Sequence, residues 1–576
     1  MGRQHTWVMA SVALAMLGGC GSADKAGARG GFFGDGGVFG GSGQSGREPT
    51  AGGNTGSAGT SGASQDAGVA ALPPETGATI DLQLPQASNH YVYATNPAAG
   101  TVSVIDAKTL SIRTLDTGER PTYLRTLKNT DSAIVLNIGS DTATVLRASA
   151  SNVLSGDLAV VKGANAIGVA PDGAHAVVYY NSSYASAGNT SGSFQDVSVL
   201  TLSSDGKTDA AISMTVGFRP RDVFFSADGK RAFVVTEDGV SVLDFAAIER
   251  SGSSIARLLP FGGGVDQKTL DVAVTPDGKY ALARAEGKSV LQLVDLATGT
   301  VKSLNVAKAY VAPSPVDDGS DAGVPAPLPI IITDLALVPS GSTAIAVLRN
   351  QSAMLTLPLP GAFDDPTKVT TRTVEGEIVG SVSIAPDGHD ALLYTTATAA
   401  KRITIVDLTS DAAPHVVALR KAVQAVTFTP DGRTALITHT KLPGDPSAAG
   451  ISPDDAIDRS FGYSLLRVPA GDVKLQVTQT SVGPIAMVPD GTYLFILFRD
   501  DAAGIKEVHR VALASFLVDP IIALESPPIS IGAAAASGNV FVNQEHPDGR
   551  MTFIDWQDPT IKNTVTGFEL NSRIRD

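Results

Sequence analysis

The sequence predicts an all-β fold made of four-stranded repeat units, the architecture of a β-propeller. Three patterns beyond Thr79 carry this prediction: short apolar strands with period-two alternation, a recurring Pro-Asp-Gly turn, and a later strand that ends in aspartate. The 60 glycines and 33 prolines favour many turns over long helices. Four strands in a repeat of about 45–60 residues are typical of propeller blades.

The recurring turn is expected to join the first two strands of each unit. Proline presets the first dihedral of such a turn, aspartate closes it with its side chain, and glycine accepts the positive φ. Each turn lies between two apolar strands, so the pattern indicates a series of hairpins. The turns are Pro171–Gly173, Ala227–Gly229, Pro276–Gly278, Pro339–Gly341, Pro386–Gly388, Pro430–Gly432 and Pro489–Gly491.

Aspartates at the end of a later strand mark the second pattern. They precede polar turns, and we therefore interpret them as turn caps rather than as a ring of ligands. These residues are Asp106, Asp244, Asp295, Asp407 and Asp555. Repeat units counted in this way begin near 79, 120, 164, 218, 269, 331, 379, 423, 484 and 529. Propellers typically have about four to eight blades, so the sequence leaves open 7–10 blades and one ring or two.

The first unit carries a more specific pattern. Tyr91–Asn96 reads YVYATN, and Gly100–Asp106 continues as GTVSVID. This stretch resembles the YVTN-type β-propeller repeat of bacterial surface and periplasmic proteins, and later units resemble it in weakened form over most of residues 79–576. The same superfold includes lactonase-like enzymes, so the resemblance implies a fold and leaves the function open.

The first twenty residues have the layout of a secretory signal peptide. Arg3 precedes an apolar run from Trp7 to Leu17 that is too short to span a bilayer, and Gly18-Gly19-Cys20 follows. This segment resembles a bacterial lipoprotein signal, in which an aliphatic residue and two small residues precede a lipidated cysteine. The resemblance implies a signal peptide over 1–19 and acyl chains such as palmitate on Cys20, the only cysteine. The alternative is an ordinary cleaved signal peptide.

Residues 20–78 are expected to form a tether. The segment after Cys20 is rich in Gly, Ser, Ala and Thr, and cannot bury enough apolar surface to offset the entropy of ordering. A Gly-rich chain of this length has an end-to-end distance of roughly 40–45 Å. The expected location is the cell envelope, and Gly21 in place of aspartate favours the outer membrane under the enterobacterial sorting rule. Periplasmic and surface-exposed orientations both stay open.

Three long insertions interrupt the repeats at 181–195, 310–329 and 442–462. In a propeller they project from the face opposite the Pro-Asp-Gly turns, and we therefore place a candidate binding site on that face. Its candidate residues are Asp317, Asp318, Asp321, His439, Asp454, Asp455, Asp458 and His546. Neither acidic group matches a known calcium loop, so we expect no metal and no cofactor. Decoration without function is the alternative for these insertions.

The sequence contains no motif that identifies a catalytic site. There is no Gly-x-Ser-x-Gly elbow, the histidines show no metal-ligand spacing, and the only thiol is assigned to lipidation. A net charge of −14 argues against nucleic acid as a partner. Aromatic residues make up 6% of the chain, so a stacked carbohydrate platform is poorly supported.

We therefore expect a binding or scaffold lipoprotein that engages a protein, glycan or small ligand at the envelope, and lean away from an enzyme. The membrane is expected as a partner through the lipid on Cys20. The alternative function is a lactonase-like or other hydrolytic propeller enzyme. A third hypothesis is a structural role in surface assembly.

Overall fold

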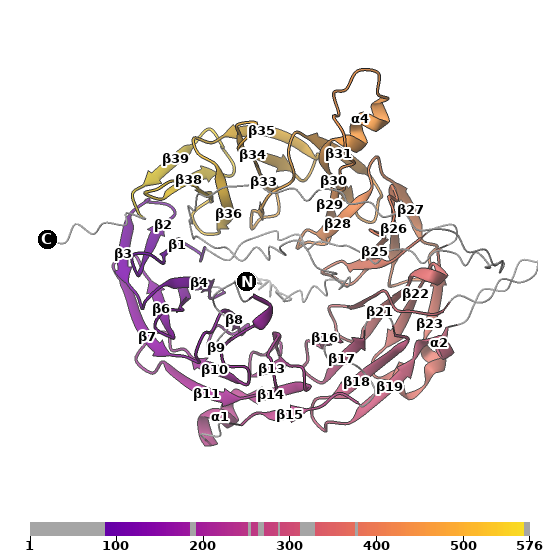
Figure 1. Ribbon diagram of the computed structural model, residues 1–576, viewed down its shortest axis with the longest axis horizontal. Helices are drawn as coiled ribbons and strands as arrows, with labels where there is room; N and C mark the ends of the chain where they lie inside the picture. The colour runs from indigo at the N-terminus through magenta and orange to yellow at the C-terminus, as the bar shows by residue number, and fades with distance from the viewer. Residues whose placement is uncertain are drawn as a thin grey trace, which may run out of the picture.

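The computed structural model describes residues 87–568, except residue 129 and segments 185–191, 252–254, 263–269, 286–287, 311–328 and 375–377. Ten antiparallel sheets follow one another around a single ring, which Figure 1 shows face-on. Nine of these sheets have four strands in chain order. The protein is a ten-bladed β-propeller, which confirms the predicted fold and settles the number of units at ten in one ring.

Each four-stranded blade begins at the centre of the ring and runs outward (Figure 1). The innermost strands are β4 (Pro121–Thr126), β8 (Ala166–Val169), β12 (Asp222–Phe225), β16 (Leu270–Val274), β20 (Asp334–Leu337), β24 (Ser381–Ile384), β28 (Val423–Phe428), β32 (Ile485–Met487) and β36 (Pro528–Ala534). The second strands are β1 (Tyr91–Asn96), β5 (Ser132–Asn137), β9 (His175–Tyr179), β13 (Arg231–Val235), β17 (Tyr280–Ala285), β21 (Thr343–Leu348), β25 (Asp390–Tyr394), β29 (Thr434–His439), β33 (Tyr493–Asp500) and β37 (Asn539–Gln544).

The outer half of each blade has the same regularity. The third strands are β2 (Thr101–Asp106), β6 (Thr142–Ala148), β10 (Asp196–Thr201), β14 (Val240–Asp244), β18 (Val290–Asp295), β22 (Ala353–Pro358), β26 (Arg402–Asp407), β30 (Phe461–Arg467), β34 (Ile505–Ala512) and β38 (Arg550–Asp555). The outermost strands are β3 (Ile112–Asp116), β7 (Val153–Ala159), β11 (Ala210–Thr215), β15 (Arg257–Leu259), β19 (Val301–Asn305), β23 (Thr370–Thr373), β27 (His415–Ala418), β31 (Val473–Thr478), β35 (Leu517–Ala523) and β39 (Lys562–Thr566).

Short helices occupy some of the connections between strands. The α-helices are α1 (Phe245–Ser251), α2 (Val306–Ala309), α3 (Gly361–Asp364) and α4 (Pro453–Arg459). The 3-10 helices are η1 (Ser182–Tyr184), η3 (Arg349–Gln351) and η4 (Pro366–Lys368). Among the described residues, no helix is both long and apolar enough to cross a bilayer.

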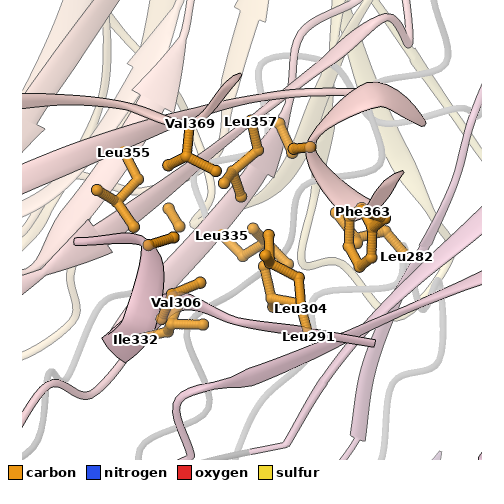
Figure 2. Packing of buried hydrophobic residues seen from close by; sticks show 14 of the residues in the cluster. Leu282, Leu291, Leu304, Val306, Ile332, Leu335, Leu355, Leu357, Phe363 and Val369 are labelled. Carbon is orange, nitrogen blue, oxygen red and sulfur yellow. The ribbon is translucent and has the colours of Figure 1, made fainter. Parts of the chain in front are cut away.

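The core lies between the faces of neighbouring blades. Figure 2 shows one such layer, in which Leu282 and Leu291 of one blade pack with Leu335 and Leu355 of the next. Second and third strands are buried along most of their length, because both of their faces meet a neighbouring sheet. Outermost strands such as β3 alternate between exposed and half-buried residues. This gradient explains why second and third strands are continuous apolar runs in the sequence.

The Pro-Asp-Gly turns form the predicted hairpins. In six of them the aspartate side chain accepts the backbone N–H two residues ahead, at 2.9–3.1 Å. The seven turn glycines have φ between 64° and 76°, a region that glycine adopts without a steric penalty. The strand-end aspartates also cap turns: Asp106 Oδ1 accepts from the backbone of Lys108 and Thr109 at 2.9 and 2.8 Å. The interpretation of these aspartates as caps is confirmed.

The ring closes by packing of the last blade against the first. Phe541 and Phe553 of the last blade are buried with Val92 and Ile105 of the first. The side-chain amide of Asn539 also donates to the carbonyl of Ala107 at 2.7 Å. The four strands of the last blade all come from the C-terminal part of the chain. Among the described residues, closure therefore combines apolar packing between two sheets with hydrogen bonds such as that of Asn539.

The first sheet has three described strands, β1 to β3. Ala87 forms an isolated antiparallel bridge with Val92 beside the inner edge of β1. The expected start of this unit near residue 79 lies outside the described residues.

Replacing Phe541 by Ala is expected to lower the free energy of unfolding by about 3–5 kcal/mol, because it leaves a cavity in the closing layer. Ile561→Ala is the control, since Ile561 is 51% exposed, and it should change stability by less than about 0.5 kcal/mol. Urea unfolding followed by circular dichroism measures both. Equal effects of the two substitutions would contradict closure by this layer.

Candidate functional site

The strand order divides the connections between two faces of the ring. Within each blade neighbouring strands are antiparallel, so the Pro-Asp-Gly turns and the third-to-fourth connections share one face. The second-to-third connections and the links between blades share the other, which we call the insertion face. The insertions lie between β9 and β10, β19 and β20, and β29 and β30. All three therefore belong to the insertion face, where we place the candidate functional site.

The third insertion is held at its base by a buried lysine. Lys421 is fully buried, and its Nζ donates to the carbonyls of Ile457, Asp458 and Ser460 at 2.6, 3.1 and 2.9 Å. Burial lowers the pKa of this lysine. The carbonyls of Ile457 and Asp458 lie in the last turn of α4 and also accept the backbone N–H groups of Ser460 and Leu442. Lys421 therefore adds a charged donor to a helix terminus that the backbone satisfies only in part. Figure 1 shows α4 standing out at the outer edge of the ring.

A second lysine fixes the same helix from the neighbouring blade. Lys401 Nζ lies 2.7 Å from Asp458 Oδ2, and the backbone N–H of Leu442 donates to the carbonyl of Asp458 at 2.9 Å. Both ends of the insertion thus meet at Asp458. The segment 440–460 is therefore held to the ring by an ion pair and a backbone hydrogen bond.

A buried arginine holds the end of the middle insertion. Arg284 is 4% exposed, pairs with Asp271, and donates from Nη1 to the carbonyls of Ile332 and Thr333, each at 3.1 Å. Asp334 follows directly and accepts the backbone N–H of Val382 in the next blade at 2.9 Å. Burial raises the pKa of Asp334 to about 6, although its backbone hydrogen bonds and Arg284 favour the charged form. The residues after this insertion are thus tied to two neighbouring blades.

Two buried asparagines hold the start of the first insertion. The backbone N–H of Asn181 donates to Asn165 Oδ1 at 2.7 Å, and Asn165 Nδ2 donates back to the carbonyl of Asn181 at 3.0 Å. Asn181 Nδ2 also donates to the carbonyl of Arg221 in the following blade at 2.8 Å. Asn165 and Asn181 are 3% and 2% exposed. All three insertions therefore emerge from bases fixed by buried polar side chains.

These anchoring residues were not among the candidates taken from the sequence. Arg284 could have been singled out from the sequence, because it is the one charged residue in the apolar strand β17. Lys421 lies two residues before the apolar inner strand β28, and a charged residue at that place does not by itself indicate whether the side chain is buried. Asn181 marked the start of an insertion, but its partner Asn165 lies 16 residues away.

The structure separates the predicted acidic residues. Asp317, Asp318 and Asp321 lie outside the described residues. Asp454 and Asp455 lie in the first turn of α4 and are exposed, and the Asp455 backbone N–H donates to Ser452 Oγ at 3.1 Å. Asp458 is the residue that joins the insertion to Lys401 and is not an open ligand.

The two predicted histidines differ in their surroundings. His439 is 4% exposed, and its ring nitrogens lie 3.1 Å from the carbonyl of Ala422 and 2.7 Å from Ser464 Oγ. Burial lowers the pKa of His439 to about 4, so its ring is neutral at physiological pH. His546 is half-buried in the β37–β38 turn, and its Nδ1 accepts the backbone N–H of Asp548 at 3.2 Å. His439 therefore supports the framework, whereas His546 remains partly accessible on the insertion face.

In the described part of the chain, no three His, Cys, Asp or Glu residues are grouped so that they could hold a metal ion.

No protein-family model matches the chain, and no curated protein matches it. Structural similarity is found to the dihydro-heme d1 dehydrogenase NirN in complex with DHE, with TM-score 0.37 and 14% identity over 65% of this chain and 72% of that one. It is also found to Kuenenia stuttgartiensis hydrazine synthase, with TM-score 0.31 and 16% identity over 60% and 95%. A eukaryotic initiation factor gives TM-score 0.46 and 9% identity over 75% and 96%. The propeller assignment rests on the sheet topology described above.

Replacing Lys421 by Met is expected to loosen the third insertion, because three carbonyls lose their charged donor and each such hydrogen bond contributes about 1.5–3 kcal/mol. Thermolysin should cut within residues 440–460 at least about tenfold faster, while the rest of the ring stays intact. Lys207→Met, on an 81% exposed side chain, is the matched control and should leave the cleavage rate unchanged. An unchanged rate in Lys421→Met would contradict the anchoring role.

The stability of the protein should depend on pH through His439. Its pKa is about 4 in the folded state against 6.5 for the ordinary group, so the unfolded chain binds the proton first on acidification. The contribution of the neutral His439 ring to the free energy of unfolding is fully present above pH 6.5 and is lost as the pH falls towards 4. The loss amounts to about 3 kcal/mol.

His439→Gln should lose this part of the pH dependence. Urea unfolding of both proteins at pH 7 and pH 4 measures the difference. Parallel losses in the two proteins would show that His439 is not the responsible group.

Proposed function

We propose that this protein is a lipid-anchored binding module of the cell envelope, in which the propeller presents its insertion face to a partner. The observation that carries the proposal is the clamped third insertion, with Lys421 bound to three carbonyls at the base of α4. A buried cation with three backbone partners keeps an exposed acidic segment in one place. Such preorganisation lowers the entropic cost of binding a partner.

The other two insertions support the same face. Their bases are held by Arg284 and by the Asn165–Asn181 pair, so each insertion leaves the ring from a fixed position. Long loops on a rigid scaffold are the usual place for binding residues. The function proposed is therefore display of a composite surface by three insertions, on a propeller that we assign to the YVTN-type repeats.

The envelope part of the proposal comes from the N-terminal sequence. Leu17-Gly18-Gly19-Cys20 at the end of an apolar run supports lipidation of Cys20, and residues 21–78 supply a tether. The outer membrane is the proposed location. A tether of roughly 40–45 Å would let the ring stand clear of the lipid surface.

Site-specific photo-crosslinking in cells tests the binding face. A photoreactive amino acid placed at Asp454, on exposed α4, should give a defined adduct with one envelope component. The same amino acid at Lys279, which is 69% exposed on the Pro-Asp-Gly face, is the matched control and should give none. Mass spectrometry of the adduct identifies the partner.

The Cys20→Ser variant is the control for anchoring in that experiment. It should fractionate with soluble proteins and lose the adduct with a membrane-bound partner. Adducts of equal yield from both faces would contradict a dedicated insertion face. Retention of Cys20→Ser in the membrane fraction would contradict lipid anchoring while leaving the face assignment intact.

A further inference from the structure

An aromatic–arginine cluster lies on the insertion face beside the first insertion. Phe194 ends that insertion, and its ring centroid lies 6.0 Å from that of Phe218, which precedes the inner strand of the next blade. The Arg219 guanidinium carbon lies 5.8 Å from the centroid of Phe194 and 5.1 Å from that of Phe218. Tyr180 meets Phe194 edge-on at 5.5 Å. Three aromatic residues thus gather at one place in a chain with few of them.

The cluster is exposed. Phe218 is 36% exposed, and the other large apolar side chains with substantial exposure in the described chain are all aliphatic. The Arg219 side chain is 43% exposed and lies 3.3 Å from Glu237, whose side chain is 19% exposed. An accessible ring, a cation and a carboxylate therefore stand side by side on the surface.

Backbone hydrogen bonds hold the cluster in place from three directions. The N–H of Arg219 donates to the carbonyl of Phe194 at 2.7 Å, and the N–H of Glu237 donates to the carbonyl of Phe218 at 2.8 Å. The N–H of Phe218 donates to Asp238 Oδ2 at 2.7 Å. The insertion, the link between blades and the β13–β14 turn are thereby joined. These hydrogen bonds fix the positions of Phe218 and Arg219 within the framework of the ring.

An equivalent turn elsewhere in the ring shows which features of Phe218 and Arg219 the backbone geometry requires and which it does not. Gly118-Glu119-Arg120-Pro121 occupies the corresponding link between the first two blades, and Arg120 has φ +55° where Arg219 has φ +51°. The carbonyl of Glu119 accepts a backbone N–H at 2.9 Å, as that of Phe218 does. The turn therefore explains the left-handed backbone of both arginines. It does not require phenylalanine, because glutamate stands at the same place in the other turn.

We propose that the Phe218–Arg219 cluster binds an uncharged sugar ring of a glycan. The exposed part of the Phe218 ring offers apolar surface to the C–H groups of a pyranose. Arg219 only donates hydrogen bonds and the carboxylates of Glu237 and Asp238 accept them, and sugar hydroxyl groups do both. Glu237, Asp238 and the net charge of −14 disfavour an anion, and Arg219 disfavours a cation.

This proposal rests on the insertion face being the binding face and names the ligand class for one part of it. The low aromatic content argued against a carbohydrate platform when only the sequence was considered. The two rings come from positions 24 residues apart, and only the fold brings them together. The site needs no tryptophan, because the apolar face is supplied by Phe218 against Phe194.

Calorimetric titration of the full chain in detergent tests the proposal. The probes are four neutral oligosaccharides, namely chitotetraose, cellotetraose, mannotetraose and galactotetraose, with oligoglucuronate and chitosan oligomer as charged comparisons. At least one neutral probe should bind and the charged ones should not. Phe218→Ala should weaken that binding at least about tenfold, whereas Phe218→Tyr should retain it.

The matched control is the Glu119→Ala/Arg120→Ala double variant, which alters the equivalent turn and should change affinity less than about twofold. Failure of all four neutral probes, tighter binding of a charged probe, or unchanged affinity in Phe218→Ala would each overturn the proposal. A crosslinked partner at Asp454 together with no sugar binding would reject the sugar site alone. Absence of both would reject the insertion face itself.

Discussion

The ring depends on dry packing between neighbouring sheets, and every insertion interrupts that packing where backbone polar groups are buried. Buried backbone groups must find partners, and the protein meets this constraint with side chains from within the ring. Lys421 donates to three backbone carbonyls and Arg284 donates to two. The side chain of Asn165 pairs with both the backbone N–H and the backbone carbonyl of Asn181. The same contacts that keep the core satisfied also fix the insertions. The stability of the ring and the fixed position of the insertions therefore depend on the same hydrogen bonds.

The repeat pattern was predictable because it is local. A Pro-Asp-Gly turn needs an aspartate side chain that accepts a hydrogen bond from the backbone N–H two residues ahead and a glycine with positive φ. Both requirements concern residues that are adjacent in the sequence. Units expected near 269 and 423 have inner strands that start at Leu270 and Val423. The closure of ten blades into one ring was not predictable in this way. It depends on the angle between neighbouring sheets, which arises from packing such as that of Phe541 against Val92.

The candidate site was predictable only as a face. Strand order within a blade dictates which connections share a side, so the position of the insertions follows from the repeat. The individual residues do not follow, because their roles depend on neighbours distant in sequence. Asp458 belongs to an acidic group in the sequence, yet Lys401 from another blade makes it an anchor. Phe194 and Phe218 look unremarkable alone and form a cluster because a link between blades crosses the end of an insertion.

The central claim is that the insertion bases are part of the rigid ring, and native-state hydrogen exchange tests it most directly. The backbone N–H groups of Asn181 and Leu442, which are bonded at these bases, should exchange about as slowly as those in the buried third strands β10 and β30. The exposed turn N–H of Lys279 provides the fast reference. Protection of Asn181 and Leu442 close to that of the buried strands is the predicted result. Exchange as fast as that of Lys279 would contradict the account, because the insertions would then move independently of the ring.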